Sequence, residues 1–214
     1  EGMDPGNQLS TDDFAGHLAH NSNLSIKAIL ALGGYSVLAE MTGRKSEATT
    51  YRQLAQDMAN RWAQMAEDGD HYRLAFDKPG TWSQKYNLVW DRILGLNLFP
   101  PKVAQTELHY YEAHLNPFGL PLDNRRDYTK LDWEVWTATL ADNRKEFDTL
   151  IAPLQRFINE SPSRVPLTDW YSTTDGKQSG FQARSVVGGV YLPLLAASDL
   201  WKKWSSKAQI PGEH

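Results

Sequence analysis

Residues 24–41 read LSIKAILALGGYSVLAEM, and residues 46–67 read SEATTYRQLAQDMANRWAQMAE. The first segment is apolar on nearly every side, whereas the second carries a single apolar stripe at three- and four-residue spacing. A helix that is apolar all round is buried on both sides, and a striped helix covers a surface. Asn21 offers an N-cap for the first helix, and Gly43 stands where a C′ glycine belongs. The pair therefore predicts a helical hairpin with an inner and an outer helix.

The same alternation repeats along the chain. Inner helices, which are apolar on most sides, are expected near residues 24–41, 87–98, 131–141 and 184–197. Outer, striped helices are expected through residues 46–67, 103–115 and 147–158, with a short last helix that begins at 201–204. Such alternation describes hairpins packed in two concentric layers, as in an α/α toroid; a plain helical bundle or a solenoid is the alternative. A closed toroid of this type uses six hairpins, and the pattern fills only four, so we expect an all-α, incomplete α/α toroid.

One local exception to the helical pattern is expected. Residues 71–76 and 81–84 alternate in the way of short strands, and Asp77-Lys78-Pro79-Gly80 between them has the composition of a tight turn. The sequence thus predicts one short β-hairpin between two helical pairs. For the chain as a whole we expect a linker over residues 1–8, the toroid domain over 9–205 and a C-terminal tail over 206–214.

Composition narrows the classes of function. The net charge of −4 argues against a nucleic-acid partner, which requires a basic face. The absence of cysteine excludes a Cys nucleophile, a thiolate metal site and disulfides. We find no run of about 18 apolar residues, so no membrane span is expected, and the polar start Glu1-Gly2-Met3-Asp4 has no signal-peptide pattern. Eight Trp and nine Tyr residues favour a flat-faced ligand site as well as a core.

The loops that precede the inner helices are the most polar and aromatic parts of the chain. If helices alternate between layers, all inner helices run in the same direction, and these loops meet at one rim. They cover residues 11–21, 81–87, 122–130 and 167–182. The opposite connections, such as residues 42–45, are short. Because function sits preferentially on loops held by a rigid scaffold, we place the candidate site at this rim.

Acids at the rim are the candidates for proton transfer. We predict catalytic roles for Asp127 and Asp132, with Asp13 as the third candidate. Either Arg126 or Lys130 would hold one carboxylate ionised, and a dry aromatic setting near Trp133 would raise the pKa of another. The alternative is structural: Asp127 pairs with a neighbouring arginine, and Asp132 caps its helix.

Further polar and planar side chains of these loops and helix starts are candidates for binding a small polar substrate, such as a sugar. They are His20, Asn23, Trp82, Lys85, Trp90, Asp91, Asp123, Arg126, Lys130, Trp133 and Trp170. The sequence contains no G-x-S-x-G elbow, no H-E-x-x-H and no glycine-rich phosphate loop, and no cofactor is expected. A metal site made by His17, His20 and Asp13 is a minor alternative, and we otherwise expect no metal.

Three stretches at this rim resemble the glutaminase A family of fungi and bacteria. Residues 12–29 read DDFAGHLAHNSNLSIKAI, residues 82–91 read WSQKYNLVWD, and residues 119–133 read GLPLDNRRDYTKLDW. The similarity extends roughly from Leu9 to Leu195. These motifs are long enough to be specific for the family.

The resemblance implies both a fold and an activity. The helical domain of this family is grouped with the six-hairpin glycosidase-like toroids and normally follows β-rich N-terminal domains. Named members are extracellular enzymes that hydrolyse L-glutamine to L-glutamate and ammonia. The chain is then expected to be the helical domain of a secreted or periplasmic glutaminase-like hydrolase, with the β-rich domains of the same full-length protein as partners.

Two other functions remain open at this point. A glycoside hydrolase or a carbohydrate-binding toroid is favoured by the fold relatives and by the acidic, aromatic rim. A non-catalytic helical module that packs against partner domains is the third possibility. An incomplete ring leaves apolar surface uncovered, and such patches often mark a partner, so self-association is also expected.

Overall fold

The computed structural model describes residues 2–10 and 15–207, and most of this part of the chain is helical. The helices are α1 (Ser22–Met41), α2 (Lys45–Ala66), α3 (Val89–Ile93), α4 (Pro101–Glu112), α5 (Leu131–Ala138), α6 (Arg144–Glu160), α7 (Pro193–Ala196) and α8 (Ser198–Ser205). Two 3₁₀ helices, η2 (Tyr86–Leu88) and η3 (Ser185–Tyr191), precede α3 and α7, and the strands β1 (Tyr128–Lys130) and β2 (Trp170–Ser172) form a two-stranded sheet.

Helices α1 and α2 form the first hairpin at the residues that the periodicity predicts. The side chain of Asn21 accepts a hydrogen bond from the backbone N–H of Leu24 and so caps α1. Gly43 takes a φ of 78°, the left-handed conformation that lets the chain reverse into α2. Trp62 of α2 is fully buried, and its Nε1 donates to the carbonyl of Ser22 at 2.8 Å, which ties the two helices together at the rim end.

Helix α1 is less enclosed than an inner helix was expected to be. Its first half is buried, but Leu38 is 58% exposed and Met41 77% exposed. Among the described helices, α1 is long and apolar enough to cross a membrane, judged by length and composition alone. No such segment was expected from the sequence. A core helix of a protein can have the same length and composition. Helix α1 packs along α2 and is partly buried inside the chain.

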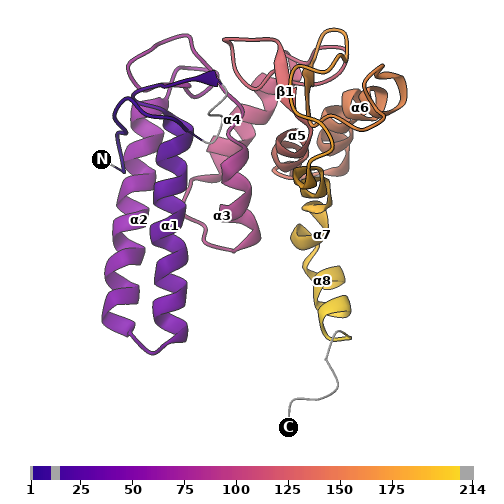
Figure 1. Cartoon of the computed structure of the whole chain (residues 1–214). Coiled ribbons are helices and arrows are strands. Elements are labelled where there is room, and N and C mark those ends of the chain that lie inside the picture. Colours follow the sequence, from indigo (N-terminus) through magenta and orange to yellow (C-terminus); the bar gives the residue numbers. More distant parts are fainter. Residues whose placement is uncertain (1, 11–14, 208–214) are drawn as a thin grey trace.

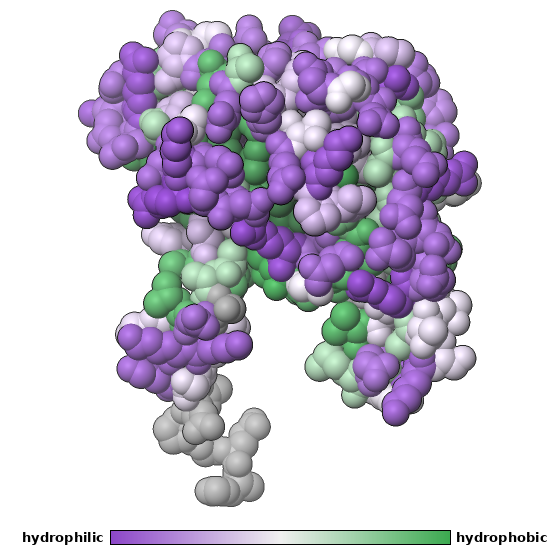
Figure 2. Space-filling view, turned by 180° about the vertical axis from the view of Figure 1, so that it is seen from behind, coloured by the Kyte–Doolittle hydropathy of each residue, from purple (hydrophilic) through white to green (hydrophobic). Residues whose placement is uncertain are grey.

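The helical elements follow one another as an arch (Figure 1). They pack in order, α1 on η2, η2 on α5 and α5 on η3, while α4 packs on α6. The arch has α1 and α2 on one side, and α7 and α8 follow one another along the other. Seen from behind, hydrophobic residues show on both legs of the arch (Figure 2). The chain is mostly helical as predicted, but η3 and α7 contain no buried residue, and the two concentric layers and their closure into a toroid stay predictions.

The later inner helices are shorter than the sequence pattern indicated. The helix predicted at 87–98 ends at Ile93, because the chain turns at Gly95 and Asn97, both with positive φ. The helix predicted at 131–141 ends at Ala138. Over 184–197 the chain forms η3 and the four-residue α7, since Pro193 lacks the N–H that a continuous helix needs.

The predicted β-hairpin over 71–84 does not form as two paired strands. Its two arms are joined by the hydrogen bond from the N–H of Leu74 to the carbonyl of Thr81 at 3.1 Å. Their bridges go to other parts of the chain: Ala75 bridges to Asn21, and Ser83 bridges to Asp123. The actual sheet joins β1 to β2 in antiparallel register, with Thr129 opposite Tyr171. The turn composition of 77–80 was therefore interpreted correctly as a reversal of the chain, but the strand partners are long-range.

Two adjacent glycines in α1 provide a matched test of the packing between hairpins. A Cβ added at Gly33 would lie 2.6 Å from Cδ1 of the buried Leu98, whereas a Cβ at Gly34 would meet nothing within 4 Å. We expect Gly34→Ala to raise the free energy of unfolding by about 0.5–1 kcal/mol, because alanine is the better helix former. We expect Gly33→Ala to lower it by about 1–2 kcal/mol through overpacking. Urea unfolding of both variants checks this, and an equal gain in both would contradict the contact between α1 and Leu98.

Candidate active site

Long-range backbone pairing draws the predicted rim loops to one end of the arch. Gln84 donates its backbone N–H to the carbonyl of Leu122 at 2.8 Å, and Leu131 donates to the carbonyl of Asp169 at 2.9 Å. The pairing of β1 with β2 joins loop 122–130 to loop 167–182. In Figure 1 these loops lie at the end of the molecule opposite the α1–α2 turn. The described part of the first loop joins the same region through the bridge from Asn21 to Ala75.

A buried ion cluster lies where β1 leads into α5. The carboxylate of Asp169 is fully buried and accepts a hydrogen bond from Nζ of Lys130. Arg184 holds the same carboxylate in a fork, with Nη2 at 2.5 Å from Oδ2 and Nε at 3.2 Å from Oδ1. Burial lowers the pKa of the Lys130 ammonium to about 8, so this group is still mainly cationic at neutral pH. Two cations therefore share one buried carboxylate.

Asp132 lies beside this cluster in the first turn of α5. Its residue is 5% exposed, and its Oδ1 is buried with no hydrogen-bond partner among residues 2–10 and 15–207. Burial raises the pKa of the Asp132 carboxyl above its ordinary value, while the charges of Lys130 and Arg184 act in the opposite direction. The backbone of Gly189 in η3 packs against this side chain, where a Cβ would lie 2.8 Å from Cβ of Asp132. Asp132 is thus a buried carboxyl that takes up a proton more readily than a free aspartate.

Aromatic rings surround the same groups. Tyr86 and Trp133 stack with ring centroids 4.4 Å apart and planes 4° from parallel. Trp170 contacts both Tyr128 and Phe181, at 5.4 Å and 5.2 Å between centroids. Nζ of Lys130 lies 5.7 Å from the ring centre of Trp133 and 5.8 Å from that of Phe181. These rings exclude water from the cluster and present flat surfaces at its edge.

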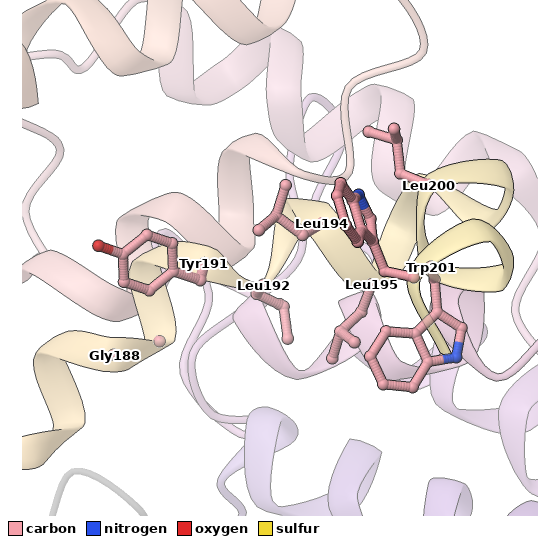
Figure 3. Close-up of a pocket in the computed structure, with 9 residues that line it drawn as sticks. Gly188, Tyr191, Leu192, Leu194, Leu195, Leu200 and Trp201 are labelled. Carbon is pink, nitrogen blue, oxygen red and sulfur yellow. The ribbon is translucent and has the colours of Figure 1, made fainter. Parts of the chain in front are cut away.

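A cavity of about 500 Å³ lies between η3, α7 and α8 (Figure 3), and it is lined in part by Gly189, which also packs against Asp132. Its lining is mostly apolar and includes Leu192, Leu195, Leu200, Trp201 and Trp204. The phenol of Tyr191 is its one titratable side chain. Carboxyl and cationic groups gather instead in the cluster at the rim, which is therefore the candidate site.

The family model of the glutaminase A six helical-hairpin domain matches residues 1–194. This chain belongs to the glutaminase A family. It is 37% identical over 198 residues to Glutaminase A of Aspergillus oryzae, a match that covers 89% of this chain and 29% of that protein. It is 30% identical over 219 residues to a probable glutaminase of Arthroderma benhamiae, covering 87% of this chain and 25% of that protein. The chain thus spans less than a third of the length of either relative.

In this glutaminase A family chain, three of the predicted site residues lie close together: Asp132, Lys130 and Trp133. Trp170 lies across the β1–β2 pair from them, with Lys130 opposite Trp170 in the register. Asp127 is an exposed loop residue whose carbonyl accepts from Thr173, and its catalytic role stays a prediction. Arg126 is likewise exposed.

Three predicted binding residues have structural contacts instead. Lys85 is fully buried, and its Nζ donates to the carbonyls of Tyr72 and Ser83. The carboxylate of Asp91 accepts from the backbone N–H groups that follow α3, and the carboxylate of Asp123 pairs with Arg125. These contacts turn the three side chains toward the chain itself, and we do not include them in the candidate site.

The other predicted residues lie around the rim without joining the cluster. Trp82 is buried against Tyr110 and His114, and Trp90 packs edge-on against Trp136. Oδ1 of Asn23 is buried and has no hydrogen-bond partner in the part of the chain that the structure covers.

His20 has a positive φ of 59°, and its Nδ1 lies 2.7 Å from the carboxylate of Asp4. Asp13 lies outside the described residues, and so does part of the metal site suggested with His17 and His20. Residues 2–10 and 15–207 contain no group of three or more His, Asp or Glu that could hold a metal ion.

Sequence reasoning missed Asp169 and Arg184, and it interpreted Glu134 only as an acid favoured in the first turn of its helix. Asp169 stands in a loop that the rim argument had selected, but nothing in the sequence marks it as the partner of Lys130. Arg184 follows that loop and carries no motif of its own. Glu134 accepts hydrogen bonds from the Leu120 N–H and the Tyr171 O–H, each at 2.5 Å, and burial raises its pKa well above the usual range. Glu134 thus holds loop 119–120 on α5.

The raised pKa of Asp132 predicts a pH dependence of stability. The folded state retains a proton on Asp132 at a pH where the unfolded chain has released it, so this residue costs stability as the pH rises through its folded-state pKa. Asp132→Asn removes the titration. We expect the variant and the native chain to unfold at similar urea concentrations near pH 3.5, and the variant to be the more stable above pH 7. A difference in stability that does not change with pH would contradict a raised pKa.

Proposed function

We propose that this chain is the helical part of a glutaminase-like amidohydrolase that converts L-glutamine to L-glutamate and ammonia. The observation that carries the proposal is Asp132: a buried carboxyl with a raised pKa, at the start of α5 and beside Lys130 and Arg184. The proposal is also supported by the glutaminase names of the relatives.

Amide hydrolysis sets the requirements for the site. The oxygen of a water molecule attacks the side-chain carbonyl carbon of glutamine, and the bond from that carbon to the amide nitrogen breaks. One proton leaves the water, and one must reach the nitrogen so that it departs as ammonia. Asp132 in its protonated form is the proposed donor to that nitrogen, and Asp127, a neighbour on the same loop-to-helix segment, is the proposed acceptor from water.

The wider setting of the site is also part of the proposal. The helical pairs of this chain are one section of a closed six-hairpin α/α toroid that further segments of the full-length protein complete. The β-rich N-terminal domains expected from the family stand against the same helical domain, and the full-length protein is secreted or periplasmic. Until the ring is closed, the exposed apolar side chains of α7 and α8, among them Leu194, Leu200 and Trp201, drive self-association of the chain on its own.

A sugar is the second candidate substrate. Trp170 is half-buried at the edge of the cluster and packs against Phe181, which is 42% exposed. Planar rings of this kind beside carboxyl groups also suit a pyranose ring and acid–base cleavage of a glycosidic bond. The aromatic edge therefore favours a glycoside hydrolase or a carbohydrate-binding toroid over a purely structural module.

Measuring which product is formed distinguishes between these functions. Ammonia release from L-glutamine is measured for this chain and for the full-length protein, next to sugar release from a panel of glycans. Ammonia release with no sugar release supports the amidohydrolase. The reverse result replaces it with the glycoside hydrolase. If neither product forms with either protein, the chain is a non-catalytic helical module; if only the full-length protein is active, the site requires the remaining segments.

A further inference from the structure

The guanidinium of Arg184 is held in place but not fully used. Its Nε and Nη2 bind Asp169, and its Cζ lies 4.0 Å from the ring centre of Phe181. Within the described residues, Asp169 is the one side chain that accepts hydrogen bonds from Arg184. The side chain is 36% exposed. One edge of a planar group with five N–H donors is thus fixed by the protein, and the partly exposed side chain has further N–H donors for a ligand.

The position of Arg184 places it at the same rim as Asp132. Residue 185 begins η3, which packs against α5, and Gly189 of η3 lies against the side chain of Asp132. Both Lys130 and Arg184 are close enough to Asp132 to stabilise its ionised form electrostatically. A molecule bound on the exposed edge of Arg184 would therefore lie next to the carboxyl proposed to donate a proton.

Two cations of this cluster share one carboxylate. Lys130 and Arg184 both bind Asp169. Lys130 is 2% exposed and has its ammonium directed at Asp169, so it is closed to a ligand. Arg184 is thus the cation of the pair that a ligand can reach. A carboxylate matches both the geometry and the charge of a guanidinium edge.

We propose that Arg184 binds the α-carboxylate of the substrate, so that the site selects a free amino-acid amide over amides that lack this group. The proposal rests on the glutaminase-like function and adds the residue that sets its specificity. Arg184 is a substrate-binding residue in this scheme, and Asp169 is the positioning residue that holds its guanidinium in plane. Phe181 supports the face of the guanidinium.

The test compares two amides in the full-length protein. One is L-glutamine, and the other is 4-aminobutanamide, which has the same amide and amine but no α-carboxylate. Arg184→Met is expected to lower kcat/KM for L-glutamine by about 10–100-fold, the effect of losing a charge-assisted hydrogen bond. The kcat/KM for 4-aminobutanamide should stay within about threefold of the native value. Arg184→Lys, which keeps the charge but not the fork, should recover part of the loss.

A second arginine provides the matched control. Arg73 also pairs with a carboxylate, Asp68 at 2.9 Å, and lies outside the cluster. Arg73→Met should leave the ratio of the two kcat/KM values unchanged. An equal loss on both amides in Arg184→Met would make Arg184 structural and overturn the proposal.

The experiment also separates failure of carboxylate binding at Arg184 from failure of the proposed glutaminase-like function. If the native full-length protein hydrolyses neither amide, the glutaminase-like function fails, and binding becomes the measurement. A thermal shift with L-glutamine that disappears in Arg184→Met and remains in Arg73→Met would still support carboxylate binding at Arg184. No shift, or the same shift in both variants, would overturn it.

Discussion

Asp132→Asn is expected to lower the turnover of L-glutamine by the full-length protein by about a hundredfold or more, the typical contribution of a positioned acid. Asparagine has nearly the same shape as the protonated carboxyl but cannot transfer its proton. Oδ1 of Asp132 has no hydrogen-bond partner in the described part of the chain, so the exchange breaks no bond to that atom. Turnover should therefore fall while the melting temperature is kept or raised.

Glu134→Gln is the control for this prediction. Glu134 stands two residues further along α5, is equally buried and also has a raised pKa, but both of its oxygens accept hydrogen bonds inside the chain. Its substitution is expected to change turnover by no more than a few-fold. An Asp132→Asn variant that melts early but retains its rate would assign Asp132 to the scaffold, where it caps the helix.

Asp169→Ala is expected to lower the free energy of unfolding by about 3–5 kcal/mol, because it leaves Lys130 buried without its partner. For a chain of this size the melting temperature should fall by roughly 6–20 °C. The loss should shrink as the pH rises above about 8, where the buried ammonium gives up its proton. Calorimetric melting at pH 7 and pH 9 measures both effects.

An exposed ion pair provides the comparison. Arg144 and Asp148 form an (i, i+4) pair on α6 at 2.7 Å, and both side chains are largely exposed. Asp148→Ala should change the free energy of unfolding by about 0.5 kcal/mol or less. Equal effects of the two substitutions would show that the cluster at Asp169 contributes no more than a surface pair.

The helical hairpins could be predicted because their signals are local. The stripe of α2 and the apolar character of α1 follow from residues three and four apart, and the Asn21 cap and Gly43 turn act within a few residues. The failed β-hairpin over 71–84 shows the limit of this reasoning. Its turn is local, but the partners of Ala75 and Ser83 lie at Asn21 and Asp123, and no local pattern specifies them.

The candidate site was predictable in part for the same reason. Asp132, Lys130 and Trp133 are close in sequence at the start of one helix, so the rim argument places them together. Asp169 and Arg184 reach Lys130 only through the β1–β2 register and the packing of η3 on α5. Burial decides the protonation of Asp132, and burial is a property of the assembled rim.

The long-range pairing of the rim has a consequence for the order of folding. The contacts of α1 with α2 span a short stretch of chain, so this hairpin can form early, whereas Lys130 and Asp169 are 39 residues apart and Gln84 and Thr137 are 53 apart. During synthesis the ion cluster cannot form before Arg184 has left the ribosome. The α1–α2 hairpin can therefore be in place while the rim is still open, and amide hydrogen exchange should be slower in this hairpin than in loops 122–130 and 167–182.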